Sequence, residues 1–155
     1  MRFLLYNICI EIMIGEKNMN ITSFLKSFYD VTLVYDNQNL NDALATMTKH
    51  RYTSIPVINR EQKYIGTLTE GDILQFLLKN NDCFSQENLN KYVVADVKRH
   101  RDYEPIGVDA LMPTLLSKAS NENFVPIVDQ NDKFIGIVTR KTLLDYFFEH
   151  NFMIL

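Results

Sequence analysis

The feature that most constrains the fold of this chain is an internal repeat with an offset of 70 residues. Residues 54–69 read SIPVINREQKYIGTLT, and residues 124–139 read FVPIVDQNDKFIGIVT. A proline, a lysine, an Ile-Gly pair and a closing threonine are identical in both copies. Because a repeat of this kind is one supersecondary unit with too little apolar surface to stand alone, we expect the two copies to pack sheet to sheet around one shared core.

The periodicity of apolar residues predicts the order strand, helix, strand, strand, helix in each copy. Pro113 lies in the first turn of the first helix of copy two, where a proline is tolerated. The predicted elements are strands 33–35, 55–58 and 64–69 with helices 40–49 and 70–77, then strands 106–108, 125–128 and 134–139 with helices 111–116 and 143–148.

These elements predict an α+β fold of two βαββα repeats arranged as a pseudo-twofold pair. The predicted divisions are an N-terminal extension, repeat 1, a linker and repeat 2, at residues 1–18, 19–80, 81–104 and 105–155. The extension is apolar but is interrupted by Glu11, lacks a cleavage signal and is too short to span a bilayer. We interpret Met19 as the start of the protein and expect no membrane association.

Charge and cysteine content exclude several classes of protein. The 155-residue chain has a net charge of −3 and a pI near 5.6, which argues against general binding to nucleic acid or to anionic membranes. Its two cysteines, Cys9 and Cys83, provide neither a disulfide framework nor a zinc site. We therefore expect a reducing, cytoplasmic environment.

The repeated motifs resemble those of a known family, the CBS domain. Copy one has IPVIN at residues 55–59 and KYIGTLTEGD at 63–72, and copy two has VPIVD at 125–129 and FIGIVT at 134–139. The resemblance covers roughly residues 20–150 and is to stand-alone bacterial proteins with tandem CBS domains, often called Bateman modules.

The resemblance implies two clefts that hold adenosine derivatives, such as AMP, ADP, ATP, S-adenosylmethionine or cyclic di-AMP. In such proteins a Thr-x-x-Asp turn takes the ribose hydroxyls, and here that turn contains Thr69 and Asp72. A carboxylate suits this role because it accepts charge-assisted hydrogen bonds from both hydroxyls. On spacing alone, Asp72 fits the acidic first-turn residue of an ordinary helix better than it fits a ligand-binding residue. The other implied contacts lie beside the motif prolines and at strand ends: Val34, Thr53, Ser54, Ile55, Pro56, Val125, Pro126 and Thr139.

Copy two departs from the motif because Thr142 stands where the acid is expected. A hydroxyl cannot replace a bidentate acceptor, so we expect one better adenosine cleft and one weakened or empty cleft. Basic residues at 98–101 precede the first strand of copy two, and Arg140 begins the last helix. We predict that Arg99, Arg101 and Arg140 bind phosphate. The alternative for residues 98–101, a solvated charge run in a linker, is at least as consistent with the sequence.

No catalytic or metal-binding constellation is visible. None of the three histidines has a partner at metal-ligand spacing, and no Gly-rich phosphate loop exists. The aromatic residues of the final helix fit either core packing or a homodimer contact: Tyr146, Phe147, Phe148 and Phe152. We expect a non-enzymatic module that binds an adenine nucleotide as a regulatory ligand, has no other cofactor, forms a homodimer and signals to an unidentified protein. The alternative is a ligand-independent dimerisation scaffold.

Overall fold

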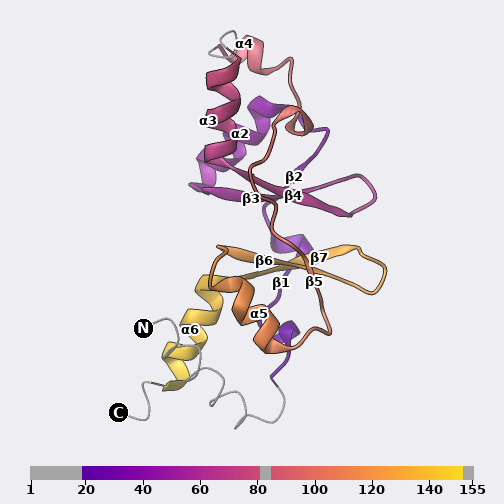
Figure 1. Ribbon diagram of the computed structural model, residues 1–155, viewed down its shortest axis with the longest axis vertical. Coiled ribbons are helices and arrows are strands. Elements are labelled where there is room, and N and C mark those ends of the chain that lie inside the picture. Colours follow the sequence, from indigo (N-terminus) through magenta and orange to yellow (C-terminus); the bar gives the residue numbers. More distant parts are fainter. Residues whose placement is uncertain (1–18, 81–84, 152–155) are drawn as a thin grey trace.

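The computed structural model describes residues 19–80 and 85–151. Two β-sheets face each other, and helices cover the outer side of each sheet (Figure 1). The first sheet has the order β2-β3-β4, and its repeat consists of β2 (Val34–Tyr35), α2 (Leu40–His50), β3 (Ser54–Ile58), β4 (Tyr64–Thr69) and α3 (Glu70–Lys79). The second sheet has the order β1-β7-β6-β5, and its repeat consists of β5 (Ile106–Gly107), α5 (Met112–Ala119), β6 (Phe124–Val128), β7 (Phe134–Thr139) and α6 (Arg140–Asn151).

The two repeats have matching strand registers. Val34 of β2 pairs in parallel with Val57 of β3, and Ile106 of β5 pairs in the same way with Ile127 of β6. Both hairpins carry a register shift at the same place in β3 and β6. Pro113 lies in the first turn of α5. The predicted α+β class and the βαββα order of both repeats are therefore confirmed.

Several short elements were not predicted. They are η1 (Ile21–Phe24), β1 (Lys26–Ser27), η2 (Phe28–Asp30), α4 (Gln86–Leu89) and η4 (Val94–Asp96). Side chains of Asn20, Ser27 and Ser85 cap three of them by accepting backbone N–H groups. Elements of two to four residues carry no measurable periodicity, so only their caps and their tertiary contacts mark them.

The segments that lead into the repeats are exchanged between them. Ile21 and Phe24, which precede the first strand of repeat 1, pack in the core of repeat 2, and Lys26 of β1 pairs antiparallel with Ile137 of β7. Conversely, Leu89 and Val94, which precede repeat 2, pack in the core of repeat 1. Each repeat is therefore completed by chain that belongs to the other in sequence order.

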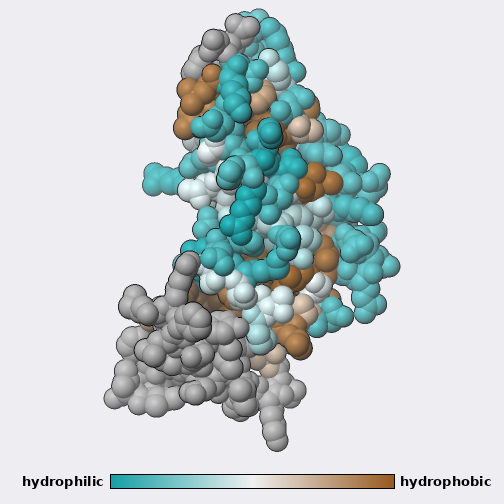
Figure 2. All heavy atoms as spheres, viewed as in Figure 1, coloured by the Kyte–Doolittle hydropathy of each residue, from teal (hydrophilic) through white to brown (hydrophobic). Residues whose placement is uncertain are grey.

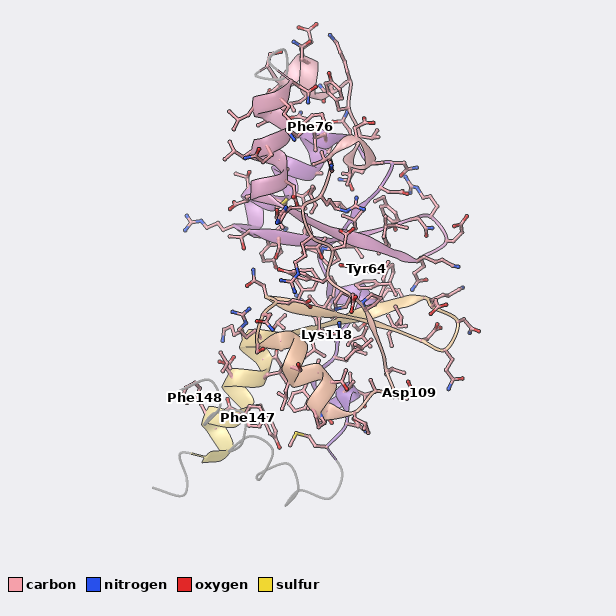
Figure 3. All side chains as sticks on the ribbon, viewed as in Figure 1. Tyr64, Phe76, Asp109, Lys118, Phe147 and Phe148 are labelled. Carbon is pink, nitrogen blue, oxygen red and sulfur yellow. The ribbon has the colours of Figure 1, made fainter. Side chains whose placement is uncertain are left out.

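The prediction of one shared core was wrong, because the buried side chains form three clusters. Two clusters lie between a sheet and its own helices, one in each repeat. The third lies between the sheets and includes Ile58, Phe124 and Phe134, with Tyr64 stacked on Phe134 at a ring separation of 6.1 Å. Tyr64 lies between the sheets in Figure 3. A sheet has two faces, so each repeat buries one face under helices and the other against its partner.

Among residues 19–80 and 85–151, no helix is long and apolar enough to cross a membrane. The predicted N-terminal extension, Cys9, Cys83 and Phe152 lie outside the described residues.

Candidate functional site

The Thr-x-x-Asp turn of repeat 1 forms a reciprocal cap at the start of α3. The Asp72 N–H donates to Thr69 Oγ1 at 3.1 Å. In return, Asp72 Oδ2 accepts from the Thr69 N–H at 3.0 Å and from the Thr69 hydroxyl at 2.6 Å. This capping box satisfies two backbone donors that a helix start leaves unpaired. Asp72 is also buried, with only 4% of its surface exposed.

The other oxygen of Asp72 binds the linker. The His100 N–H donates to Asp72 Oδ1 at 2.8 Å, so the basic segment crosses directly over the turn. A carboxylate has about four acceptor positions. Oδ2 uses two and Oδ1 uses one, so the buried carboxylate is largely occupied by the protein's own donors.

Arg99 is held beside this turn by an acidic neighbour. Its Nε donates to Asp102 Oδ1 at 2.7 Å, and the same oxygen accepts from the Thr67 N–H at 3.0 Å. Gly66 makes this approach possible, because a Cβ at that position would collide with the Asp102 carboxylate. The Arg99 side chain is only 17% exposed. The linker is thus fixed to β4 by side chains, with the guanidinium paired.

The corresponding turn of repeat 2, Thr139 to Thr142, forms the same backbone cap but contains no carboxylate. The Thr142 N–H donates to Thr139 Oγ1 at 3.0 Å, and the two hydroxyl oxygens lie 2.7 Å apart. Arg140, which we predicted to bind phosphate, donates through Nε to the carbonyl oxygens of Ala119 at 2.8 Å and Glu122 at 3.1 Å. Its Nε therefore satisfies carbonyls at the end of α5, a tertiary contact that its position in the sequence does not reveal.

The residues predicted around the adenine fall into two groups. Val34, Ile55 and Val125 are fully buried, and their side chains belong to the helix–sheet cores. Thr53 and Ser54 lie at the accessible start of β3, where Asn123 Nδ2 approaches both hydroxyls at 3.4 Å. The motif prolines that follow, Pro56 and Pro126, are buried in β3 and β6. The structure therefore brings the starts of the two equivalent strands together.

A cavity of about 420 Å³ opens at the end of α5 in repeat 2. Lys118, labelled in Figure 3, lies in its wall and donates to Glu104 Oε2 at 3.0 Å. This hydrogen bond holds the pKa of Glu104 below its usual range. The cavity is lined by Arg101, Asp102, Glu104, Ser117, Lys118, Asn121 and Glu122.

Of the residues that line this cavity, only Arg101 was predicted as a site residue, and Glu122 is the most deeply buried of those that were missed. It is 4% exposed, and its Oε2 has no hydrogen-bond partner among the described residues. Burial raises the pKa of this carboxyl. The Arg101 guanidinium lies 3.6 Å from Oε1 and is itself 61% exposed. The only signal in the sequence is that Glu122 precedes the second strand of copy two, at the position that Tyr52 has in copy one.

Within the described ranges no group of three or more His, Cys, Asp or Glu side chains could hold a metal ion.

Known proteins share both the motifs and the fold. The CBS-domain family profile matches residues 26–79 and 94–149. An uncharacterized protein of Rickettsia prowazekii is 28% identical over 131 residues, which are 84% of this chain and 39% of that protein. A homoserine O-acetyltransferase of Methanohalobium evestigatum is 22% identical over 136 residues, 83% of this chain and 26% of that enzyme.

A solved structure extends the similarity to three dimensions. CbpB of Listeria monocytogenes, in complex with cyclic di-AMP, is 27% identical with a TM-score of 0.73, covering 86% of this chain and 98% of that chain. The profile match spans both repeats and includes the Thr-x-x-Asp turn. The chain therefore belongs to the CBS-domain family, with two CBS domains in tandem.

Proposed function

We propose that this protein is a regulatory module that binds an adenine nucleotide, AMP, ADP, ATP or cyclic di-AMP, between its CBS domains. The observation that carries the proposal is the hydrogen bond from the His100 N–H to Asp72 Oδ1. It places a turn suited to ribose hydroxyls directly beneath a basic segment suited to phosphate. The CbpB similarity supports the proposal, because that protein is found with cyclic di-AMP.

The same contact supplies a route for signalling. A ribose hydroxyl that donates to Asp72 Oδ1 competes with the His100 N–H for that oxygen. Displacement of the linker breaks the contact of Asp102 with the Thr67 N–H that fixes it to β4, so an anionic ligand can compete with Asp102 for the Arg99 guanidinium. It thereby releases a guanidinium that can bind the phosphate of the ligand. A ligand shifts the equilibrium only by its differential affinity, and here the released Arg99 provides that difference.

The proposed role is regulatory rather than catalytic. The similarity to the acetyltransferase covers about a quarter of that enzyme. This extent fits an accessory module and does not account for a complete catalytic unit. The partner that reads the change is a protein still to be identified, in a cytoplasmic setting.

We further propose that the module forms a homodimer through α3 and α6. Both helices lie on the same side of the molecule (Figure 1). Leu74 and Leu78, one turn apart on α3, are exposed, and so is Leu144, the counterpart of Leu74 on α6. Apolar residues gather along this side of α3 in Figure 2. Two equivalent apolar helix faces suit a twofold contact with a second copy. Sedimentation of Leu74→Glu should show a monomer where the natural protein shows a dimer.

Calorimetry on protein freed of copurified ligand tests the nucleotide proposal. We expect binding of at least one of AMP, ADP, ATP and cyclic di-AMP, weakened by about 1.5–3 kcal/mol in Asp72→Asn. Asp42→Asn is the matched control, because Asp42 is an exposed acidic first-turn residue of α2. Equal affinity in both variants contradicts the role of Asp72. Absence of binding and of any thermal shift with all nucleotides would instead favour the ligand-independent scaffold.

A further inference from the structure

The outer edges of the equivalent strands β4 and β7 are covered in different ways. Lys26 of β1 pairs antiparallel with Ile137 of β7, so a strand covers that edge. β4 ends its own sheet, in the order β2-β3-β4, and no strand of the described residues pairs with its free edge. Unpaired N–H and C=O groups along such an edge are a template for another strand. The same edge of the repeat unit is therefore occupied in one copy and open to a strand in the other.

The segment of repeat 1 that corresponds to β1 lies beside this open edge. Ile106 of β5 follows its counterpart Val34 of β2 by 72 residues, so residues 98–99 correspond to residues 26–27, which form β1. A lysine stands first in both pairs. Residues 98–99 run past β4 without forming a strand or a helix. Repeat 1 thus contains the counterpart of β1 in an unpaired form.

A side chain occupies on β4 the place that a strand carbonyl occupies on β7. A Cβ at Gly136 would collide with the Lys26 carbonyl oxygen, whereas a Cβ at Gly66 would collide with Asp102 Oδ1. That carboxylate oxygen accepts from the Thr67 N–H at 3.0 Å. The Asp102 side chain is 43% exposed, so water or another acceptor can replace it at a lower free energy than a buried contact would require. The acceptor on the edge of β4 is therefore an exchangeable group.

Two contacts keep the segment in this form, and each depends on a residue that repeat 2 lacks. The first is the hydrogen bond of 2.7 Å from Arg99 Nε to Asp102 Oδ1, and the counterpart of Arg99 is Ser27. The second is the hydrogen bond of 2.8 Å that Asp72 Oδ1 accepts from the next backbone N–H of the linker, and the counterpart of Asp72 is Thr142. Where both residues are replaced, the segment pairs with the neighbouring strand as β1 does.

We propose that residues 98–99 are a switch strand, which the contacts of Asp72 and Arg99 keep apart from β4 and which adds to β4 when those contacts are released. The Lys98 carbonyl then replaces the carboxylate at the Thr67 N–H, in the register that β1 has on β7. The inference rests on the proposed function for its trigger, because a nucleotide bound to Asp72 and Arg99 would release both contacts together. Nucleotide binding would thereby change the backbone of the segment that joins the two repeats.

The test replaces the two residues by their counterparts from repeat 2, in Asp72→Thr combined with Arg99→Ser. NMR of the full chain should then show a backbone NOE between Thr67 and Lys98, and the Lys98 amide should exchange at least about tenfold more slowly than in the natural protein. Asp72→Thr combined with Asp102→Ala breaks the same two contacts without changing Arg99 and should give the same result. Saturating the natural protein with AMP or cyclic di-AMP should also produce this NOE.

Asp42→Thr combined with Arg101→Ser is the matched control, because Asp42 is an exposed first-turn acid of α2 and Arg101 is an exposed base of the same linker. It should show no new NOE. Asp72→Thr alone should show none either, because the Asp102 carboxylate still occupies the edge of β4.

The NOEs between β1 and β7 report in every variant that the protein is folded. Folded double variants without the NOE between Thr67 and Lys98 overturn the inference. A nucleotide that binds in calorimetry but leaves the natural protein without this NOE overturns the regulation of the switch strand. Strand addition in the variants, together with calorimetry that detects no nucleotide, would show that the proposed function has failed while the switch strand stands.

Discussion

Both exchanged segments bury apolar side chains, and Val94 and Ala95 bond through their backbone to Gln38 and Asp36 of repeat 1, but the stretches that cross β7 and β4 are held by different means. Repeat 2 holds the incoming chain through its backbone, since β1 pairs with β7 and Ile21 and Phe24 are buried beneath it. Repeat 1 holds residues 98–102 largely through the side chains of Asp72, Arg99 and Asp102. Contacts made by side chains at the surface break at a lower free energy than backbone hydrogen bonds between strands that lie over a buried core. The comparison indicates which half of the molecule can respond to a ligand.

The glycines at the two crossings provide the largest test of this difference. Gly136 has φ +153°, and a Cβ there would collide with the Lys26 carbonyl oxygen, which belongs to the backbone. At Gly66 the collision is with the Asp102 side chain, which can rotate away. Gly136→Ala should lower the free energy of unfolding by about 3 kcal/mol or more, and Gly66→Ala by about 1–2 kcal/mol. Urea denaturation measures both, and equal losses would contradict the distinction.

The residues that close the two turns should also differ in their contribution to stability. Asp72→Ala removes the return half of a capping box and leaves the His100 N–H without its acceptor, so we expect a loss of about 2–3 kcal/mol. Thr142→Ala removes one hydroxyl contact and should cost about 1 kcal/mol or less. Hydrogen exchange should show faster opening of residues 98–102 in Asp72→Ala alone. A protected linker in that variant would mean that Asp72 does not hold it.

The buried carboxyl of Glu122 makes the stability of repeat 2 depend on pH, and the equivalent position in repeat 1 is Tyr52, which has no carboxyl. Burial raises the pKa of Glu122 above its ordinary value of 4.5, so the folded protein keeps the proton at pH values where the unfolded chain has lost it. The free energy of unfolding therefore falls as pH rises from the ordinary pKa through the raised one, and then stays constant. Glu122→Gln should remove this fall and become up to about 1 kcal/mol more stable than the natural protein at neutral pH. Thermal unfolding of both proteins as pH is raised checks the prediction, and parallel curves would contradict it.

The smallest expected effect is a gain. Thr142→Asp would give the second turn the carboxylate of the first and complete a capping box at the start of α6. We expect about 0.5 kcal/mol of added stability from the cap and the helix dipole. The variant should not fix residues 98–102 more firmly, because those residues cross the first turn. Chemical denaturation measures the gain, and a loss would mean that the hydroxyl pair fits this turn better than an acid does.

The sequence by itself determined the duplication, the two hairpins, the helices that follow them and the position of the Thr-x-x-Asp turn. These features depend on short-range patterns, because strand alternation, helix periodicity and caps act within a few residues. The cap between Thr69 and Asp72 spans only three positions, so the spacing was enough to place it.

Only the tertiary structure decided which polar groups are already paired. His100 binds Asp72 across 28 positions, and Arg140 binds the Ala119 carbonyl across 21. No periodicity links such residues, because their contact results from the exchange of segments and the stacking of the sheets. The burial of Glu122 has the same origin, since neighbouring elements exclude water from a carboxylate that its sequence position suggests is exposed.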